Sequence, residues 1–238
     1  MSDEFYRYSA TVGGSCWPRL ATWYLGRGYP CAFIPAALGG TGIVEFLPGA
    51  DHEDRNTLYG SMVHRVRVAG GKVKAVLWWQ GEIDASANMT QAVYNAHLDT
   101  IANAVMADLG CKLMPCKLLN CSGLTAPQQA AINNAVAEAW GDNPNVLTGP
   151  DLTGVASDDA YHYLLDAKAQ AVADLWASSL EPVVNQMVSV DYTTGVNAVV
   201  NAYTSNVIWH VPPVDASLGA YAIIPRSNKV YFLSLIHI

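Results

Sequence analysis

The stretch VLWWQGEIDA, residues 76–85, decides the fold of this chain. It opens with four large apolar residues and continues at once with an amide, a glycine and a carboxylate, Gln80-Gly81-Glu82. A continuous apolar run predicts a strand, here 73–79, that is buried on both faces, as in a parallel sheet covered by helices. Ligands bind such sheets beyond the carboxyl ends of the strands, so the polar residues follow the strand where a site is expected.

Helical and strand patterns alternate on both sides of this strand, which predicts an α/β fold with a doubly wound layer and right-handed crossovers. After Pro182 the chain is rich in Val, Asn, Thr and Tyr, which favours short strands and turns. We therefore expect an α/β domain over 1–182 and a small β-rich segment over 183–238, each incomplete at its outer end. The expected order is helix 18–26, strand 30–38, helix 57–69, strand 73–79, helix 90–109, strand 112–119, helix 126–140, strand 145–147 and helix 163–180.

The composition of the chain argues against several classes of function. The 238 residues are 51% hydrophobic and 14% charged, with a net charge of −7 and no Lys/Arg cluster, which argues against nucleic acid as a partner. No apolar run reaches the roughly 18 residues of a membrane span, and MSDEFYRYSA is not a signal peptide. The five cysteines form neither a disulfide framework nor a zinc spacing, so we expect small buried residues and no metal. Compartment and oligomeric state stay open.

Three loops follow successive predicted strands and are expected to lie together. They are Gly39-Gly40-Thr41, Gln80-Gly81-Glu82 and the segment 158–162. A glycine N–H and a side-chain amide are the donors from which an oxyanion hole for acyl transfer is built. Asp159 stands three residues before His162, so its carboxylate can hold the imidazole in one tautomer and make it a general base.

Each loop also has an ordinary structural explanation. Gly-Gly-Thr is a common turn, Asp158 or Asp159 is a good helix N-cap, and Glu82 alone can be a solvated carboxylate. Because the three loops follow successive strands, the functional interpretation is favoured.

Three segments carry a resemblance to a known family. GGTGIVEFLPG at 39–49, LYGSMVHRVRVAGGKVKAVLWWQGEIDA at 58–85 and DAYH at 159–162 resemble the sialate O-acetylesterase, or carbohydrate esterase family six, branch of the SGNH hydrolases. The resemblance covers about residues 13–181. It implies a flavodoxin-like three-layer α/β/α sandwich with a mainly parallel sheet. It also implies an esterase that removes O-acetyl groups from carbohydrates by a Ser-His-Asp mechanism, without a metal or organic cofactor.

The resemblance assigns roles residue by residue. His162 is the base and Asp159 orients it, while Glu82 ties its loop together. Gly40 and Gln80 contribute to the oxyanion hole. The full oxyanion and substrate-binding set is Gly39, Gly40, Gln80, Gly81 and Glu82.

The nucleophile departs from the family pattern. The family carries its serine in a Gly-x-Ser-Asn motif at the end of its first strand, and this sequence has no such motif. Ser15, in Gly13-Gly14-Ser15, is the nearest candidate; Ser9, Ser61 and Ser122 have weaker contexts. The alternative is that the first strand and its serine precede the sequence given.

Two further functions stand beside the esterase. One is a catalytically incomplete glycan-binding module in a phage or cell-surface assembly, and the other is a purely structural α/β domain. Convergence of Glu82, Asp159 and His162 would argue against the structural domain. A serine hydroxyl within hydrogen-bond reach of His162 would separate enzyme from binder.

Overall fold

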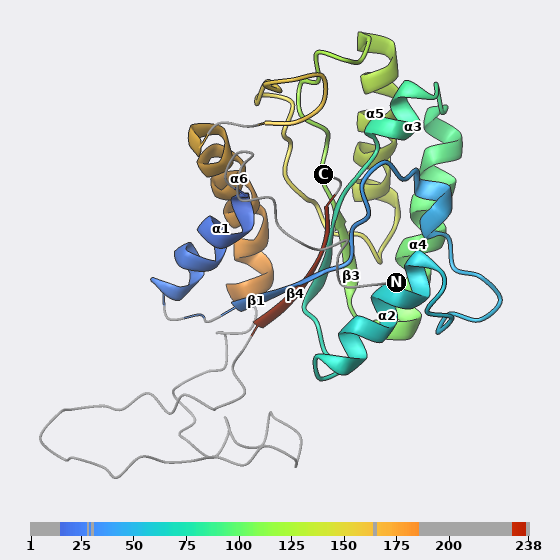
Figure 1. Cartoon of the computed structure of the whole chain (residues 1–238), viewed down its shortest axis with the longest axis vertical. Helices are drawn as coiled ribbons and strands as arrows, with labels where there is room; N and C mark the ends of the chain where they lie inside the picture. The colour runs from blue at the N-terminus through green and yellow to red at the C-terminus, as the bar shows by residue number, and fades with distance from the viewer. Residues whose placement is uncertain (1–14, 28, 30, 164–165, 186–229, 237–238) are drawn as a thin grey trace, which may run out of the picture.

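The computed structural model describes residues 15–27, 29, 31–163, 166–185 and 230–236 (Figure 1). Helices alternate with short parallel strands, as the sequence predicts. The elements are α1 (Cys16–Leu25), β1 (Cys31–Pro35), the 3-10 helix η2 (Ile43–Phe46), α2 (Leu58–Val68), β2 (Ala75–Trp79), α3 (Glu82–Ser86), α4 (Gln91–Leu109), β3 (Lys112–Pro115), α5 (Ala126–Asp142), α6 (Asp166–Asn185) and β4 (Val230–Ile236).

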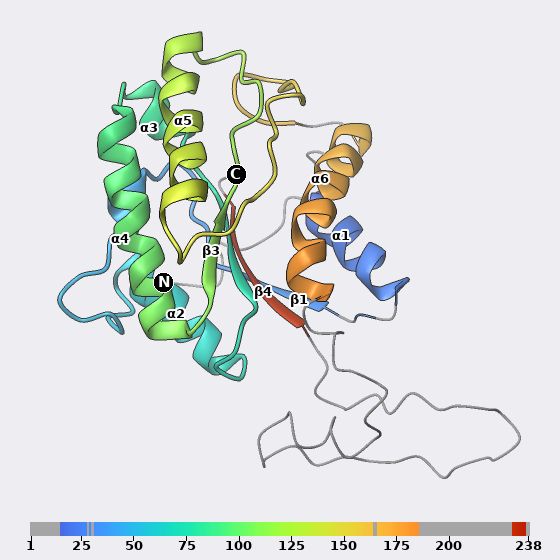
Figure 2. The same cartoon turned by 180° about the vertical axis from the view of Figure 1, so that it is seen from behind.

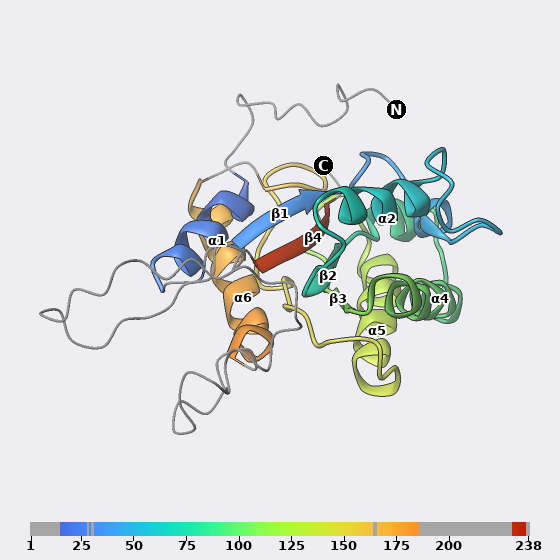
Figure 3. The same ribbon diagram turned by 90° about the horizontal axis from the view of Figure 1, so that it is seen from below.

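The strands form a parallel sheet in the order β1-β4-β2-β3. Helices α1 and α6 lie on one face of this sheet, and α2, α4 and α5 lie on the other (Figures 2 and 3). Helices combined with a small parallel sheet confirm the α/β class. The flavodoxin-like assignment stays a prediction.

Strand β2 is buried over all five of its residues, which explains its unbroken apolar sequence. Val76 and Trp78 pack into the core on the side of α2, α4 and α5. Leu77 and Trp79 pack into the core on the side of α1 and α6. Successive side chains of a strand point to opposite faces, so a strand between two helical layers needs apolar residues at every position.

Helix ends are set by local capping. The Thr90 hydroxyl accepts a hydrogen bond from the Val93 N–H at the start of α4. Thr125 and Gln128 form a capping box at the start of α5. Helix α4 ends at Gly110, whose φ of 63° is the left-handed conformation that favours glycine. These caps fix the observed boundaries within a few residues of the predicted ones.

The predicted strands are shorter in the structure than expected, and 30–38 is reduced to β1 at Cys31–Pro35. The predicted strand 112–119 is observed over Lys112–Pro115. Beyond Pro115 the backbone pairs with the segment that leads to His162 at isolated bridges. The Lys117 N–H, for example, donates to the Pro150 carbonyl at 3.0 Å. The predicted strand 145–147 is reduced to an isolated parallel bridge between Leu113 and Val146.

The predicted C-terminal unit is only partly described. Residues 186–229 lie outside the described residues, and α6 runs through Pro182 to Asn185, past the expected boundary. Residues 230–236 form a strand, but it lies inside the main sheet, with Val230 beside Cys31 and Phe232 beside Ala75. The division into a domain over 1–182 and a β-rich segment over 183–238 stays a prediction. None of the helices described is long and apolar enough to cross a membrane.

All five cysteines are free thiols, as expected. Four of them are buried and Cys31 is half-buried. Burial raises the pKa of Cys16 and of Cys121 to about 12. They are therefore neutral packing residues of the folded chain.

Candidate active site

The three predicted loops meet beyond the carboxyl end of β2. The side-chain amide of Gln80 donates to the Thr41 carbonyl at 3.1 Å, which joins the first two loops. The Trp79 ring stacks on that of Tyr163, with 5.8 Å between centroids and 20° between planes. This stacking brings the residue after His162 against the strand end.

Asp159 and His162 form a carboxylate–imidazole pair. His162 Nδ1 lies 3.0 Å from Asp159 Oδ2, and both side chains are about two-fifths exposed, 41% and 44%. The other carboxylate oxygen accepts the backbone N–H groups of Tyr161 and His162, each at 2.7 Å. Those backbone donors, Tyr161 first, lower the pKa of Asp159 to about 2. The carboxylate is therefore charged at neutral pH and orients the imidazole, which leaves Nε2 for proton transfer.

The helix-cap explanation of this Asp-x-x-His motif is wrong. Helix α6 begins at Asp166, four residues after His162. Asp159 instead closes the turn 159–162 on itself through its two backbone hydrogen bonds. The carboxylate is thereby fixed toward His162 and not toward a helix end.

Gln80 holds the loops together through both hydrogens of its amide. Its Nε2 donates to the Thr41 carbonyl at 3.1 Å and to the carboxylate of Asp84. The Tyr94 hydroxyl donates to the backbone carbonyl of Gln80 at 2.7 Å. In this arrangement Gln80 offers no unused N–H to a ligand, so its role in the oxyanion hole stays a prediction that requires one of these bonds to be exchanged.

Asp84 is a further member of this network. Its carboxylate accepts the Ile43 N–H at 3.0 Å, and burial raises its pKa. A Cβ on Gly42 would lie 2.9 Å from the Asp84 carboxylate, so glycine is needed for this approach. The sequence alone does not indicate this contact, because Ile43 lies 41 residues before Asp84 in the chain.

The predicted glycines lie in two different environments. Gly39 and Gly40 form an exposed turn, and Gly40 has a φ of 76°, which favours glycine. Gly81 has a φ of 143°, and a Cβ there would lie 2.7 Å from Ile132 Cγ2. Gly81 therefore permits the tight turn between Gln80 and Glu82. A donor role for Gly39 and Gly40 remains a prediction.

Glu82 is a buried carboxyl at the start of α3. Only 6% of the residue is exposed, and its Oε2 has no hydrogen-bond partner among the residues described. Burial raises the pKa of Glu82 to about 7, against a smaller opposing effect of His162. Convergence of Glu82 with the Asp159–His162 pair stays a prediction.

Comparison with known proteins identifies the family. A family model described as carbohydrate esterase, sialic acid-specific acetylesterase, matches residues 20–180. This chain belongs to that esterase family. It is also 35% identical over 85 residues to a probable carbohydrate esterase of Arabidopsis thaliana. That segment covers 34% of this chain and 30% of the relative. No solved structure matches the chain.

The esterase-family match confirms the resemblance recognised in the sequence. The matched range includes all three loops and the residues Gln80, Asp159 and His162. It excludes Ser15, the tentative nucleophile.

Ser15 lies near the site but acts as a helix cap. Its Oγ accepts the Trp17 N–H at 3.2 Å at the start of α1. The next residue, Cys16, donates its N–H to the Tyr163 hydroxyl at 3.1 Å. Among the described residues, no hydrogen bond joins Ser15 to His162, so the nucleophilic role of Ser15 stays a prediction.

A second histidine–carboxylate pair lies elsewhere in the chain. His52 Nδ1 lies 2.8 Å from Asp108 Oδ2, which also accepts the Tyr59 hydroxyl at 2.6 Å. Asp108 is at the carboxyl end of α4, away from the loops that follow β1 and β2. No group of three His, Cys, Asp or Glu residues suited to a metal occurs in the ranges described.

The buried Glu82 predicts a pH-dependent difference in stability between wild type and Glu82→Gln. Its carboxyl has a pKa of about 7 when folded and 4.5 ordinarily, so between these pH values only the folded chain keeps the proton. The free energy of unfolding of the wild type should then fall by about 1.4 kcal/mol for each pH unit across this window. The Glu82→Gln variant has no carboxyl at this position, so its free energy of unfolding should increase relative to that of the wild type as pH rises.

Urea unfolding of both proteins at pH 5 and at pH 8 measures this difference. Asp84, whose pKa is also raised, is present in both proteins. A stability difference that is the same at both pH values would contradict the prediction.

Proposed function

We propose that this chain hydrolyses O-acetyl esters of carbohydrates, with His162 as general base and Asp159 as the residue that orients it. The observation that carries the proposal is the Asp159–His162 pair, with 3.0 Å between Oδ2 and Nδ1, within a chain of the esterase family. The stacking of Trp79 at the end of β2 on Tyr163, the residue after His162, supports the assignment of this end of the sheet as the reacting site.

The reaction is an acyl transfer in two halves. A serine Oγ attacks the acetyl carbonyl carbon while His162 Nε2 takes the hydroxyl proton. The tetrahedral intermediate then expels the sugar alcohol, which receives that proton from the imidazolium. Water attacks the acetyl-serine by the same route, releasing acetate and restoring the serine hydroxyl. The charged Asp159 stabilises the imidazolium in both halves.

Donors to the developing oxyanion are proposed from the loops after β1 and β2. Gly39 and Gly40 are exposed and can turn backbone N–H groups toward a ligand. Gln80 can contribute by exchanging its hydrogen bond to Thr41 or to Asp84 for one to the substrate. One such donor accounts for about 2.7–4 kcal/mol of transition-state stabilisation in acyl transfer.

Release of acetate from O-acetylated sugars tests the proposed function, with wild type beside Asp159→Asn and Ser15→Ala. The wild type is expected to release acetate, and Asp159→Asn to be slower by about 10²-fold or more, because its imidazole is no longer held by a charged group. If Ser15 is the nucleophile, Ser15→Ala is inactive.

Two results would change the assignment. An active Ser15→Ala protein would move the nucleophile to another hydroxyl. A folded wild type that binds acetylated sugars without releasing acetate would contradict the esterase and favour a binding module.

A further inference from the structure

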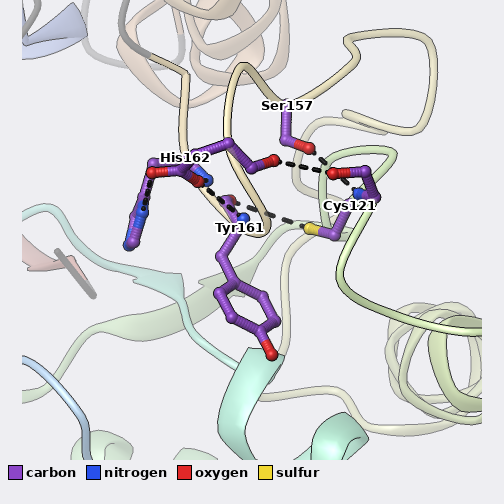
Figure 4. A network of polar contacts seen from close by, with 6 residues as sticks. Cys121, Ser157, Tyr161 and His162 are labelled. Atoms are coloured by element: carbon purple, nitrogen blue, oxygen red, sulfur yellow. Dashed lines mark hydrogen bonds and ion pairs between the residues drawn. The ribbon is translucent and has the colours of Figure 1, made fainter.

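The loop between β3 and α5 is hydrogen-bonded to the loop that carries Asp159 and His162. Figure 4 shows the Cys121 thiol of the first loop directed toward Tyr161 of the second loop, which also carries Ser157 and His162. We call residues 120–123 the clamp. We call residues 155–162, which include Asp159 and His162, the histidine loop. The two segments are distant in sequence: Ser122 of the clamp and Asp159 of the histidine loop are 37 residues apart.

Backbone hydrogen bonds form the first part of the clamp. The Asn120 N–H donates to the Val155 carbonyl at 2.9 Å, and the Ser157 N–H donates to the Asn120 carbonyl at 3.0 Å. The Gly123 N–H donates to the Ala160 carbonyl at 2.8 Å. Together they fix the histidine loop at points before and after Asp159.

Side chains form the second part. The Ser122 hydroxyl donates to the backbone carbonyl of Asp159 at 2.8 Å. The Ser122 N–H donates to the Ser157 hydroxyl oxygen at 3.0 Å. The buried thiol of Cys121 points at the Tyr161 carbonyl, 3.7 Å away. The clamp therefore contacts the backbone of Asp159, which belongs to the Asp159–His162 pair, and the backbone of Tyr161, which directly precedes His162.

Gly123 of the clamp packs closely against Ala160 and Tyr161 of the histidine loop. A Cβ on Gly123 would lie 2.8 Å from Ala160 Cβ and 2.9 Å from the Ala160 carbonyl oxygen. It would also lie 3.1 Å from Tyr161 Cε1. A side chain at position 123 therefore has to push residues 160–161 away from the clamp.

We infer that Ser122 and Gly123 are positioning residues, which set the place of the Asp159–His162 pair through the backbone of the histidine loop. The inference rests on the proposed function. His162 lies in a loop without regular secondary structure and is two-fifths exposed, so packing around its own side chain is incomplete. The clamp supplies the missing restraint, and a displacement of about 1 Å at a reacting group can cost 10²-fold in rate.

Gly123→Ala tests the inference, with Gly154→Ala as the matched control. Gly154 is also exposed and precedes the histidine loop, but a Cβ there has nothing within 4 Å. We expect Gly123→Ala to lower kcat for ester hydrolysis by about 10–100-fold with little change in KM. Gly154→Ala should match the wild type.

A second readout does not depend on activity. The imidazole signals of His162 are identified in NMR spectra by their loss in His162→Gln. They should move in Gly123→Ala, which disturbs the Asp159 hydrogen bond, and stay in place in Gly154→Ala. Unmoved signals in a folded Gly123→Ala protein would overturn the inference.

The two proposals fail in different ways. If the wild type hydrolyses no ester, the proposed function fails, and the NMR comparison still decides the positioning role. If Gly123→Ala does not fold, Ser122→Ala replaces it. This variant removes only the hydroxyl bonded to the Asp159 carbonyl, and Ser122→Thr should restore the His162 signals. Wild-type signals in Ser122→Ala would overturn the inference for Ser122.

Discussion

Replacing His162 with alanine is expected to lower kcat/KM for p-nitrophenyl acetate by about 10²–10⁴-fold, the usual contribution of a general base. The imidazole is held by Asp159 at 3.0 Å and no other histidine contacts that carboxylate in the described residues. Without it, the attacking hydroxyl keeps its proton and is a weak nucleophile. Initial rates at several substrate concentrations measure the loss.

His52→Ala is the matched control. His52 also pairs with an aspartate, at 2.8 Å, and is exposed to a similar extent, 39% of its side chain. It lies near the carboxyl end of α4 and should leave kcat/KM unchanged. Equal losses in the two variants, or wild-type activity in His162→Ala, would remove His162 from the mechanism.

Gly81→Ala is expected to reduce the free energy of unfolding by about 2–6 kcal/mol. Its φ of 143° is a conformation that L side chains rarely adopt, which costs about 1–3 kcal/mol. The added Cβ would lie 2.7 Å from Ile132 Cγ2 and 3.2 Å from the Tyr94 hydroxyl, and crowding of this kind costs a similar amount. Urea unfolding followed by circular dichroism measures the change.

Gly110→Ala separates the cost of the positive φ from the cost of steric crowding by the added Cβ. Gly110 also has a positive φ, 63°, but a Cβ there has nothing within 4 Å. This variant should lose only about 1–2 kcal/mol, the cost of the left-handed conformation. If Gly81→Ala loses no more than Gly110→Ala, the contacts with Ile132 and Tyr94 are not restrictive.

Local sequence patterns predicted the helices and the central strand well. The strand expected at 73–79 is β2 at 75–79, and the helix expected at 90–109 is α4 at 91–109. Both elements have strong apolar periodicity and clear ends, which depend only on neighbouring residues. The Asp159–His162 contact was predictable for the same reason, since three residues separate the partners.

Long-range contacts could not be predicted in this way. Gln80 was expected to offer its amide to a ligand, and its hydrogen bond to Thr41 spans 39 residues. The burial of Glu82 depends on the packing of several elements around the end of β2. Residues 230–236 form strand β4, and its Val230 pairs with Cys31 in β1, almost the whole chain away. Sequence periodicity gives the type of element and not its neighbours in a sheet.

The four buried thiols can report local opening of the folded chain. Because the thiolate is the reactive form, a thiol with a pKa near 12 reacts with an alkylating reagent only when its surroundings open. Cys16 belongs to α1, Cys111 precedes β3, and Cys121 belongs to the clamp. Alkylation rates resolved by mass spectrometry would therefore rank these parts of the native chain by their opening free energies, without any engineered probe.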